Sequence, residues 1–547
     1  MPGRGSPLPV LYKKMSDNLD LSIFDIVGPV MLGPSSSGTA GMMRIGAAAR
    51  QFLTAGPVKI VICFHERNMG HYEGCCSHIA LVGGLLGFSA DDPRLPGALS
   101  EAERRGIPVE IRSYPAEESP DMLRVKLYTE TSDGLCREFI ATSVGGGNIR
   151  VEKIDGCPVD LNNYAAYRFT YRGEKIVGYE KLADLAGTFG NAPEHPASVM
   201  APSRDGSDRV LDAAPFFEGG MTGNAPLFTE FSELIALCEK ENCDPAEIMI
   251  RYEMTRSGKS REEIVSRMRD MWRIIKRSVS EGSRGTYRPI MGLDDGKNGL
   301  RVLEAIRKGQ TVSGSVSAKA AAYALSVMEY AVSMGCIVAA PTCGSAGVVP
   351  GALAALQEEY GFSDEQMVNA LFVMTSIGIV MAYDGVRFSG CAAGCQGEMT
   401  VSAAMAAMGA AYLGTIRLCA EHRDTSRPDA VCPEAVFPNA ACPDAEIFCP
   451  REMTGAMICR IAGNAAAFAV KGLLGLVCDP VAGVEVPCIK RNVSAVMAAL
   501  GSADMAIAGV ESFLTPDQAS AALKDVQDHL PEYLRGGGGG CASCFRA

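Results

Sequence analysis

Long stretches without a single charged side chain dominate the second half of the sequence. Three of them cover residues 330–356, 366–383 and 399–416. Each is long enough to cross a membrane as a helix, but the first contains Pro341 and Pro350, and all three are rich in Ala, Gly or Met. Uncharged helices of this composition are typical of a large core that buries them on most sides. We therefore expect an all-α C-terminal domain and no membrane span.

The first 160 residues show a different pattern. Short runs rich in β-branched and aromatic residues alternate with turn formers, and helical patterns cover 42–53 and 78–86. The runs are 58–64, 109–114, 122–128, 136–143 and 148–154. This mixture predicts an α/β N-terminal domain.

A chain of 547 residues is too long for one ordinary domain, and its composition changes divide it into four parts. We expect an α/β domain at 1–160, an irregular segment and linker at 161–226, and an all-helical domain at 227–535. A glycine-rich tail at 536–547 carries Cys541 and Cys544.

The charge and the N-terminus exclude several classes of protein. Acidic residues outnumber basic ones by 63 to 51, which argues against binding to nucleic acids or anionic membranes. The N-terminus has no apolar stretch behind its basic residues, so a signal peptide is not expected. We therefore predict a cytoplasmic protein whose 20 cysteines are reduced and act as buried side chains, metal ligands or both.

A cluster of hydroxyl groups precedes the first predicted helix. Ser35, Ser36, Ser37 and Thr39 stand immediately before a helix that we expect to start near Ala40. Free N–H groups at a helix start, together with hydroxyl donors, suit a carboxylate or a phosphate. The alternative is an elaborate helix cap that binds nothing.

Three cysteines of the second half lie on loops rich in Gly and Pro. Cys395 belongs to the sequence SGCAAGCQGE, and Cys478 and Cys488 flank a loop that contains Pro480 and Pro487. Such loops inside an apolar helical domain favour an iron–sulfur cluster with one open iron that acts as a Lewis acid. Buried inert thiols and a structural zinc site remain alternatives.

Two further loops carry residues with chemical potential. PTCGSAGVVPG (341–351) brings Thr342 and Ser345 into a loop that either contacts a ligand or makes a tight turn between core helices. HERNMGHYEGCCSH (65–78) includes His71 and His78 and suggests a loop that lines a cleft more than a metal site.

Seven segments in order resemble the iron–sulfur-dependent L-serine dehydratases, with the family's β and α parts fused in one chain. In the first half they are SIFDIVGPVMLGPSSSGTAGMMRIGAAAR and SVGGGNIRVEKIDG. In the second half they include PAEIMIRYEMTRSGKSREEI, IVAAPTCGSAGVVPGALAALQEEYG and GCQGE, followed by LGLVCDPVAGVEVPCIKRN and the Gly-rich tail.

The resemblance implies a cytoplasmic lyase that converts L-serine to pyruvate and ammonia with a [4Fe–4S] cluster on Cys395, Cys478 and Cys488. Ser35, Ser36, Ser37 and Thr39 would bind the carboxylate of the amino acid, with Thr342 and Ser345 also at the substrate. A homodimer is the expected assembly. A tail cysteine, Cys544 or Cys541, would shield the open iron as a fourth ligand.

The sequence also departs from the family pattern. Gly38 and Cys75 stand where the family usually has histidines, and Ala392 stands where it usually has a glutamate. An apparent insertion at 423–457 contains Cys432, Cys442 and Cys449. His71, His78 and Lys297 are candidates for the catalytic base. A relative that acts on another small amino acid such as cysteine, or a silent paralogue that keeps the cluster, are the alternatives.

Overall fold

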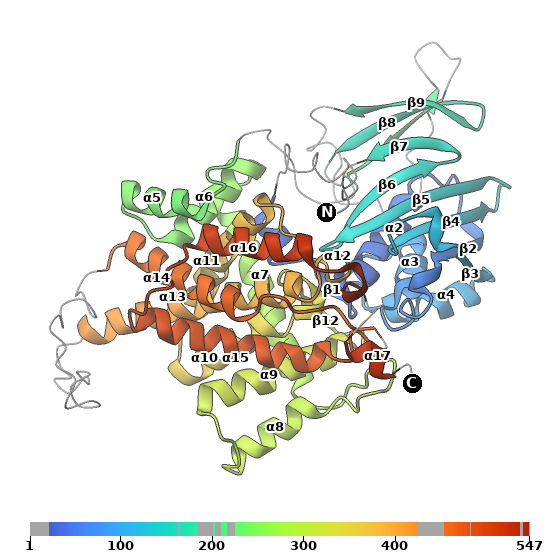
Figure 1. Ribbon diagram of the computed structural model, residues 1–547. Helices are drawn as coiled ribbons and strands as arrows, with labels where there is room; N and C mark the ends of the chain where they lie inside the picture. Colours follow the sequence, from blue (N-terminus) through green and yellow to red (C-terminus); the bar gives the residue numbers. More distant parts are fainter. Residues whose placement is uncertain are drawn as a thin grey trace, which may run out of the picture.

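The first half of the molecule is built around a six-stranded sheet (Figure 1). The computed structural model describes residues 21–161, 165–182, 201–202, 209–215, 225–423, 453–481, 483–536 and 540–545. Strand order is β3-β2-β4-β5-β6-β7; β2 and β3 are parallel and the other neighbours antiparallel. The strands are β2 (Pro57–His65), β3 (Val109–Tyr114), β4 (Arg124–Thr131), β5 (Cys136–Gly145), β6 (Asn148–Ile154) and β7 (Cys157–Leu161).

Helices cover one face of this sheet. They are α2 (Met42–Arg50), α3 (Ser77–Leu86) and α4 (Ala98–Arg104). Side chains alternate along β4, so that Val125 and Leu127 join the buried core while Tyr128 stays exposed. The α/β fold predicted for this region is confirmed.

A second, four-stranded sheet lies in the segment for which the sequence suggested an irregular linker. Its order is β10-β11-β8-β9, with β8 (Ala166–Arg172), β9 (Lys175–Leu182), β10 (Ala201–Pro202) and β11 (Arg209–Ala213). Tyr167, Phe169 and Tyr171 alternate along β8 and are buried. Their period of two is the strand signal, which the many Gly, Pro and Ser residues further along the chain obscured.

The second half is mostly helical, as predicted (Figure 1). Its helices are α5 (Phe231–Glu241), α6 (Pro245–Ser257), α7 (Arg261–Gly282), α8 (Asn298–Arg307), α9 (Ser315–Ala331), α10 (Val348–Tyr360), α11 (Asp364–Tyr383), α12 (Gly390–Ala393), α13 (Val401–Arg423), α14 (Gly455–Gly472), α15 (Cys488–Ile507), α16 (Pro516–His529) and α17 (Cys541–Phe545). Residues 424–452, most of the apparent insertion with its three cysteines, lie outside the described residues.

Two helical stretches of the described chain, 364–383 and 396–420, are long and apolar enough to cross a membrane. Their most apolar windows are 78% and 89% buried inside the protein. Their uncharged surfaces are therefore covered by neighbouring helices, as in the core of a helical domain.

The N-terminal segment joins the two halves. Helix α1 (Ile23–Ile26) belongs to the apolar core of the helical half. Strand β1 (Val30–Leu32) pairs with β12 (Cys336–Val338) in a two-stranded antiparallel sheet. Glu253 of α6 accepts hydrogen bonds from the Ser22 hydroxyl and the Ile23 N–H, at 3.0 and 3.1 Å. Residues 22–32, which the sequence analysis assigned to the first domain, are thus packed against the second.

Candidate functional site

Three cysteines from separate segments come together in the helical half. Cys395 lies between α12 and the π-helical turn η8 (Gln396–Thr400), Cys478 lies on the loop after α14, and Cys488 begins α15. All three side chains are buried. The thiol of Cys395 interacts with those of both Cys478 and Cys488. The structure therefore places the three predicted cluster ligands side by side.

A positive charge stands next to these thiols. Nη1 of Arg491 lies 3.4 Å from Sγ of Cys395 and also donates to Oδ1 of the buried Asp479, at 2.6 Å. The pKa of Cys395 lies well below the ordinary value of a thiol, because the thiols of Cys478 and Cys488 donate to it and Arg491 favours its charge. These contacts favour the thiolate form of Cys395, which is the form that binds metal.

Two buried amides hold the cysteine loops in register. Gln396 donates to the Ala393 carbonyl at 3.1 Å and accepts from the Gly475 N–H at 2.9 Å, which joins the Cys395 turn to the loop before Cys478. Asn492 donates to the carbonyls of Gly344 and Cys488, each at 2.8 Å. Because both amides are buried and bonded, the loops are fixed relative to one another.

A carboxyl group shares this site. Burial raises the pKa of Glu398 to about 8, and the nearby charge of Cys395 acts in the same direction. Glu398 accepts hydrogen bonds from the Thr342 side chain and the Gly390 N–H. A Cβ at Gly344 would lie 2.8 Å from Oε2 of Glu398, so only glycine lets the backbone approach this closely. Glu398 stands in the motif GCQGE, but the sequence alone indicates no role for it.

The loop with Thr342 and Ser345 forms one wall beside Glu398. Both side chains are buried, and their hydroxyl oxygens are 3.3 Å apart. The Ser345 hydroxyl also lies 3.3 Å from the Ala340 carbonyl, so it serves the turn itself. Thr342, by contrast, reaches the carboxyl of Glu398.

The serine-rich loop packs against Cys75. It forms the π-helical turn η3 (Ser36–Gly41), and α2 follows at Met42, two residues later than the predicted start. The Thr39 hydroxyl donates to the Cys75 carbonyl at 2.7 Å, and the Ser35 side chain accepts from the Gly38 N–H at 2.9 Å. The hydroxyls of Ser35 and Thr39 are therefore engaged in these contacts, whereas Ser36 is buried and Ser37 half-buried.

Two departures from the family pattern lie in direct contact. A Cβ at Gly38 would stand 2.6 Å from Cβ of Cys75, closer than side chains approach without a shift. Gly38 and Cys75 are thus a matched pair, in which the cysteine occupies the space beside the glycine. The Cys75 thiol also lies near Cys391 and Glu398, so this contact faces the cysteine site of the other half.

The predicted base candidates lie at the edge of the site. His71 and His78 are both half-buried; His71 lies on the loop before α3, and His78 lies in the first turn of α3. The backbone of Gly74, between them, is so close to the Cys478–Cys488 loop that a Cβ at Gly483 would lie 2.5 Å away. The pKa of His78 is lowered by burial, and its ring packs edge-on against Tyr72. These histidines thus flank the residue that contacts the cysteine loop.

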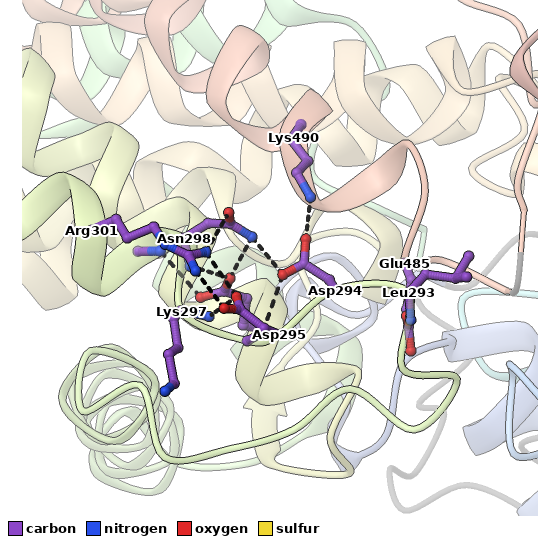
Figure 2. A network of polar contacts seen from close by, with 11 residues as sticks. Leu293, Asp294, Asp295, Lys297, Asn298, Arg301, Glu485 and Lys490 are labelled. Atoms are coloured by element: carbon purple, nitrogen blue, oxygen red, sulfur yellow. Dashed lines mark hydrogen bonds and ion pairs between the residues drawn. The ribbon is translucent and has the colours of Figure 1, made fainter.

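Lys297, the third base candidate, lies next to a polar network that links two loops. Its side chain is exposed and points away from the polar network in Figure 2. In that network, Lys490 pairs with Asp294, and the carboxylate of Glu485 accepts from the Leu293 N–H at 3.0 Å. The network ties the loop before α8 to the Cys478–Cys488 loop.

The C-terminal tail reaches the same region. The Cys541 N–H donates to Oδ2 of Asp479 at 2.7 Å, and Asp479 in turn bonds Arg491. Cys541 is half-buried, whereas Cys544 is exposed. The structure thus brings Cys541 close to the site and leaves Cys544 at the surface.

Comparisons with known proteins identify the family of the chain. The family model "Serine dehydratase alpha chain" matches residues 240–418 and 452–538. The probable L-serine dehydratase alpha chain of Bacillus subtilis is 32% identical over 57% of this chain and 90% of its own length. The probable beta chain of the same organism is 37% identical over 30% of this chain and 72% of its own. The L-serine dehydratase of Mycobacterium tuberculosis is 26% identical over 90% of both chains. These matches confirm the resemblance, and the chain belongs to the L-serine dehydratase family.

Proposed function

We propose that this protein dehydrates and deaminates L-serine to pyruvate and ammonia, using a [4Fe–4S] cluster bound by Cys395, Cys478 and Cys488. The observation that carries the proposal is the meeting of three buried thiols from separate segments beside the carboxyl of Glu398. The relatives named L-serine dehydratase, which span 90% or more of this chain, support the choice of reaction.

The donor set fits an iron–sulfur cluster. Within the described residues, no group of three or more His, Cys, Asp or Glu side chains is arranged to hold a single metal ion. Each thiolate of a cluster binds a different iron, so cluster ligands need not converge on one point as zinc ligands do. The buried thiols with Arg491 beside them therefore favour a cluster over mononuclear zinc. When bound, the cluster supplies a Lewis acid for the departing β-hydroxyl.

Glu398 is the base that this site offers. Its carboxyl is held by Thr342 and the Gly390 N–H, and a pKa of about 8 allows it both to take and to return a proton near neutral pH. Removal of the α-proton by Glu398 and loss of the hydroxyl as water leave aminoacrylate. This product tautomerises and is hydrolysed to pyruvate and ammonia in water.

The serine-rich loop binds the carboxylate of the amino acid. Ser35 and Thr39 keep the loop in shape through their bonds to Gly38 and Cys75. Ser36 and Ser37 at the start of the turn offer hydroxyl and N–H groups to an anion. Contact between this loop and Cys75 places it on the side of Cys391 and Glu398.

The test is anaerobic purification of the full chain, followed by iron and sulfide analysis and by assays of pyruvate or oxobutyrate formation. We expect a cluster in each chain and turnover of L-serine in preference to L-threonine and L-cysteine. Preference for L-cysteine would assign the other β-elimination, and a full cluster with no turnover would identify a silent paralogue. A chain that binds zinc and no iron would refute the proposal.

A further inference from the structure

A fourth cysteine lies in the thiol group, outside the set expected from the family. Cys391 is in helix α12, four residues before Cys395. Its thiol interacts with that of Cys478, which also interacts with Cys395. Together with the contact between Cys395 and Cys488, these interactions join four thiols in the order 391, 478, 395, 488. In the sequence, Ala392 is the residue here that departs from the family pattern, and nothing in the motif indicates a role for Cys391.

The backbone brings Cys391 to this place. Cys391 lies in α12, a single helical turn from Gly390 to Ala393. Gly394, with φ of +77°, ends this turn immediately before Cys395. A Cβ at Gly390 would lie 3.0 Å from Sγ of Cys478, so the glycine before Cys391 lets that sulfur approach the helix.

Cys391 also stands at the boundary between the halves. It is half-buried and packs against the apolar core of the first half. Ser389, two residues earlier, would be 3.1 Å from a Cβ at Gly145 at the end of β5. Within this group of thiols, Cys391 therefore packs against the first half of the molecule. An amino acid held by the serine-rich loop would approach from that side.

We propose that Cys391 is a fourth thiolate ligand of the cluster, which binds the iron that Cys395, Cys478 and Cys488 leave open. This inference rests on the proposed function, because it requires that cluster. The Cys391 thiol loses its proton as its sulfur donates an electron pair to the iron, and no electron is transferred. A substrate must displace this sulfur, which then takes up a proton again.

The experiment compares the anaerobically purified full-length protein with the variants Cys391→Ala and Cys391→Ser. Each sample is oxidised mildly with ferricyanide and examined by electron paramagnetic resonance and iron analysis. An iron without a cysteine ligand is lost on oxidation, and the remaining [3Fe–4S] cluster gives a characteristic signal. We expect the wild-type protein to keep its iron, and both variants to lose one iron from each cluster and to gain the signal.

Two further variants serve as controls. Cys459→Ala removes a buried thiol that also contacts another thiol, that of Cys238. This pair lies where α14 packs on α5. The Cys459→Ala variant is expected to behave as the wild type. The double variant Cys541→Ser/Cys544→Ser tests the tail, and we expect it to keep the protection against iron loss.

The outcomes separate the inference from the proposed function. If the wild-type protein holds the cluster but gives the three-iron signal as readily as Cys391→Ala, only the inference about Cys391 is overturned. If Cys391→Ala fails to fold, Cys391→Ser provides the same comparison. If the tail variant loses iron on oxidation and Cys391→Ala does not, the inference about Cys391 is also overturned, and the fourth ligand is assigned to the tail. A wild-type protein without iron and sulfide overturns both proposals.

Discussion

The helical half and the α/β half contribute to the same site by different means. In the helical half, the cysteines lie on loops fixed by the buried amides of Gln396 and Asn492, and the three expected ligands are all present. In the α/β half, the loop is held mainly by the hydroxyls of Ser35 and Thr39, and both family histidines are replaced, by Gly38 and Cys75.

Under the proposed function, this difference separates a retained set of cluster ligands from a loop whose residues have changed. Cluster ligands need a set of sulfurs at fixed positions, and a dense backbone scaffold supplies them. The loop that we propose to face the substrate contains the matched pair, in which Cys75 occupies the space beside Gly38. We therefore expect substitutions in the helical half to abolish activity and those in the α/β half to modulate it.

The largest effect is expected for Cys395→Ser. Cys395 contacts both other ligands and Arg491, so its loss removes the centre of the thiol group. We expect activity to fall below detection and iron to be lost from the anaerobic protein. The exposed Cys136, changed to Ser, is the control and is expected to retain both. Full iron content in Cys395→Ser would contradict the ligand assignment.

Glu398→Gln separates the chemistry from the cluster. The amide keeps the size of the side chain but removes the base, so we expect kcat to fall by about 10²- to 10⁴-fold. Iron and sulfide contents should remain those of the wild type. Steady-state kinetics and iron analysis of the same sample check this, and a fall in iron content would show that the carboxyl acts on the cluster instead.

Glu253→Ala tests how the N-terminal segment is attached. Glu253 is buried, pairs with Arg256 at 3.0 Å and holds Ser22 and Ile23. Removing one partner of a buried ion pair costs about 3–5 kcal/mol. Urea unfolding of the anaerobic protein should show this loss of stability. The exposed Glu262, which pairs with Arg269, is the control, and Glu262→Ala should change little.

Gly38→Ala tests the matched pair in the α/β half. The added methyl group would stand 2.6 Å from Cβ of Cys75, and overpacking of this kind costs about 1–3 kcal/mol. We expect a raised KM for L-serine with the iron content unchanged. Because Cys75→Gly removes the opposing carbon, the double variant should recover part of the loss. Additive effects in kinetics would show that the two positions are independent.

The smallest effect is expected at the surface of the helical half. Lys276, Trp272 and Gln357 hold the pKa of Asp364 down to about 2. A carboxyl with a depressed pKa stabilises the fold above its ordinary pKa, and this stabilisation is lost as the pH falls toward 2. Because Asp364 is largely exposed, Asp364→Asn should cost only about 0.5 kcal/mol at pH 7. In urea unfolding, the difference from the wild type should shrink below pH 4.

Local patterns carry most of the fold. The capping boxes at Ser260, Ser363 and Thr515 and the period of the apolar residues indicate helices that the structure contains. The β8–β9 pair was missed, because turn formers further along 161–226 outweighed a clear alternation in a short strand. The assignment of 22–32 was also incomplete, because nothing local indicates that this segment pairs with residues 300 positions away.

The site shows the same division. Motifs indicate that Cys395, Cys478 and Cys488 belong together, because these positions match the family pattern. Motif similarity gives no information about residues that act only through their neighbours in the fold. Cys391 and Glu398 gain their meaning from three-dimensional proximity, through Cys478 and Thr342. Arg491 likewise follows Cys488 by three residues but acts on Cys395, which is distant in sequence.

The strand pairing between β1 and β12 has a consequence for how the chain is made. During synthesis, residues 22–32 leave the ribosome some 300 residues before their partner strand and the helices that bury Ile23 and Ile26. The six-stranded sheet can form in the meantime, since its strands are local to the first half. The N-terminal segment therefore waits for the middle of the chain before it can dock, and the site is completed only after the later loops with Cys478 and Cys488 have been made.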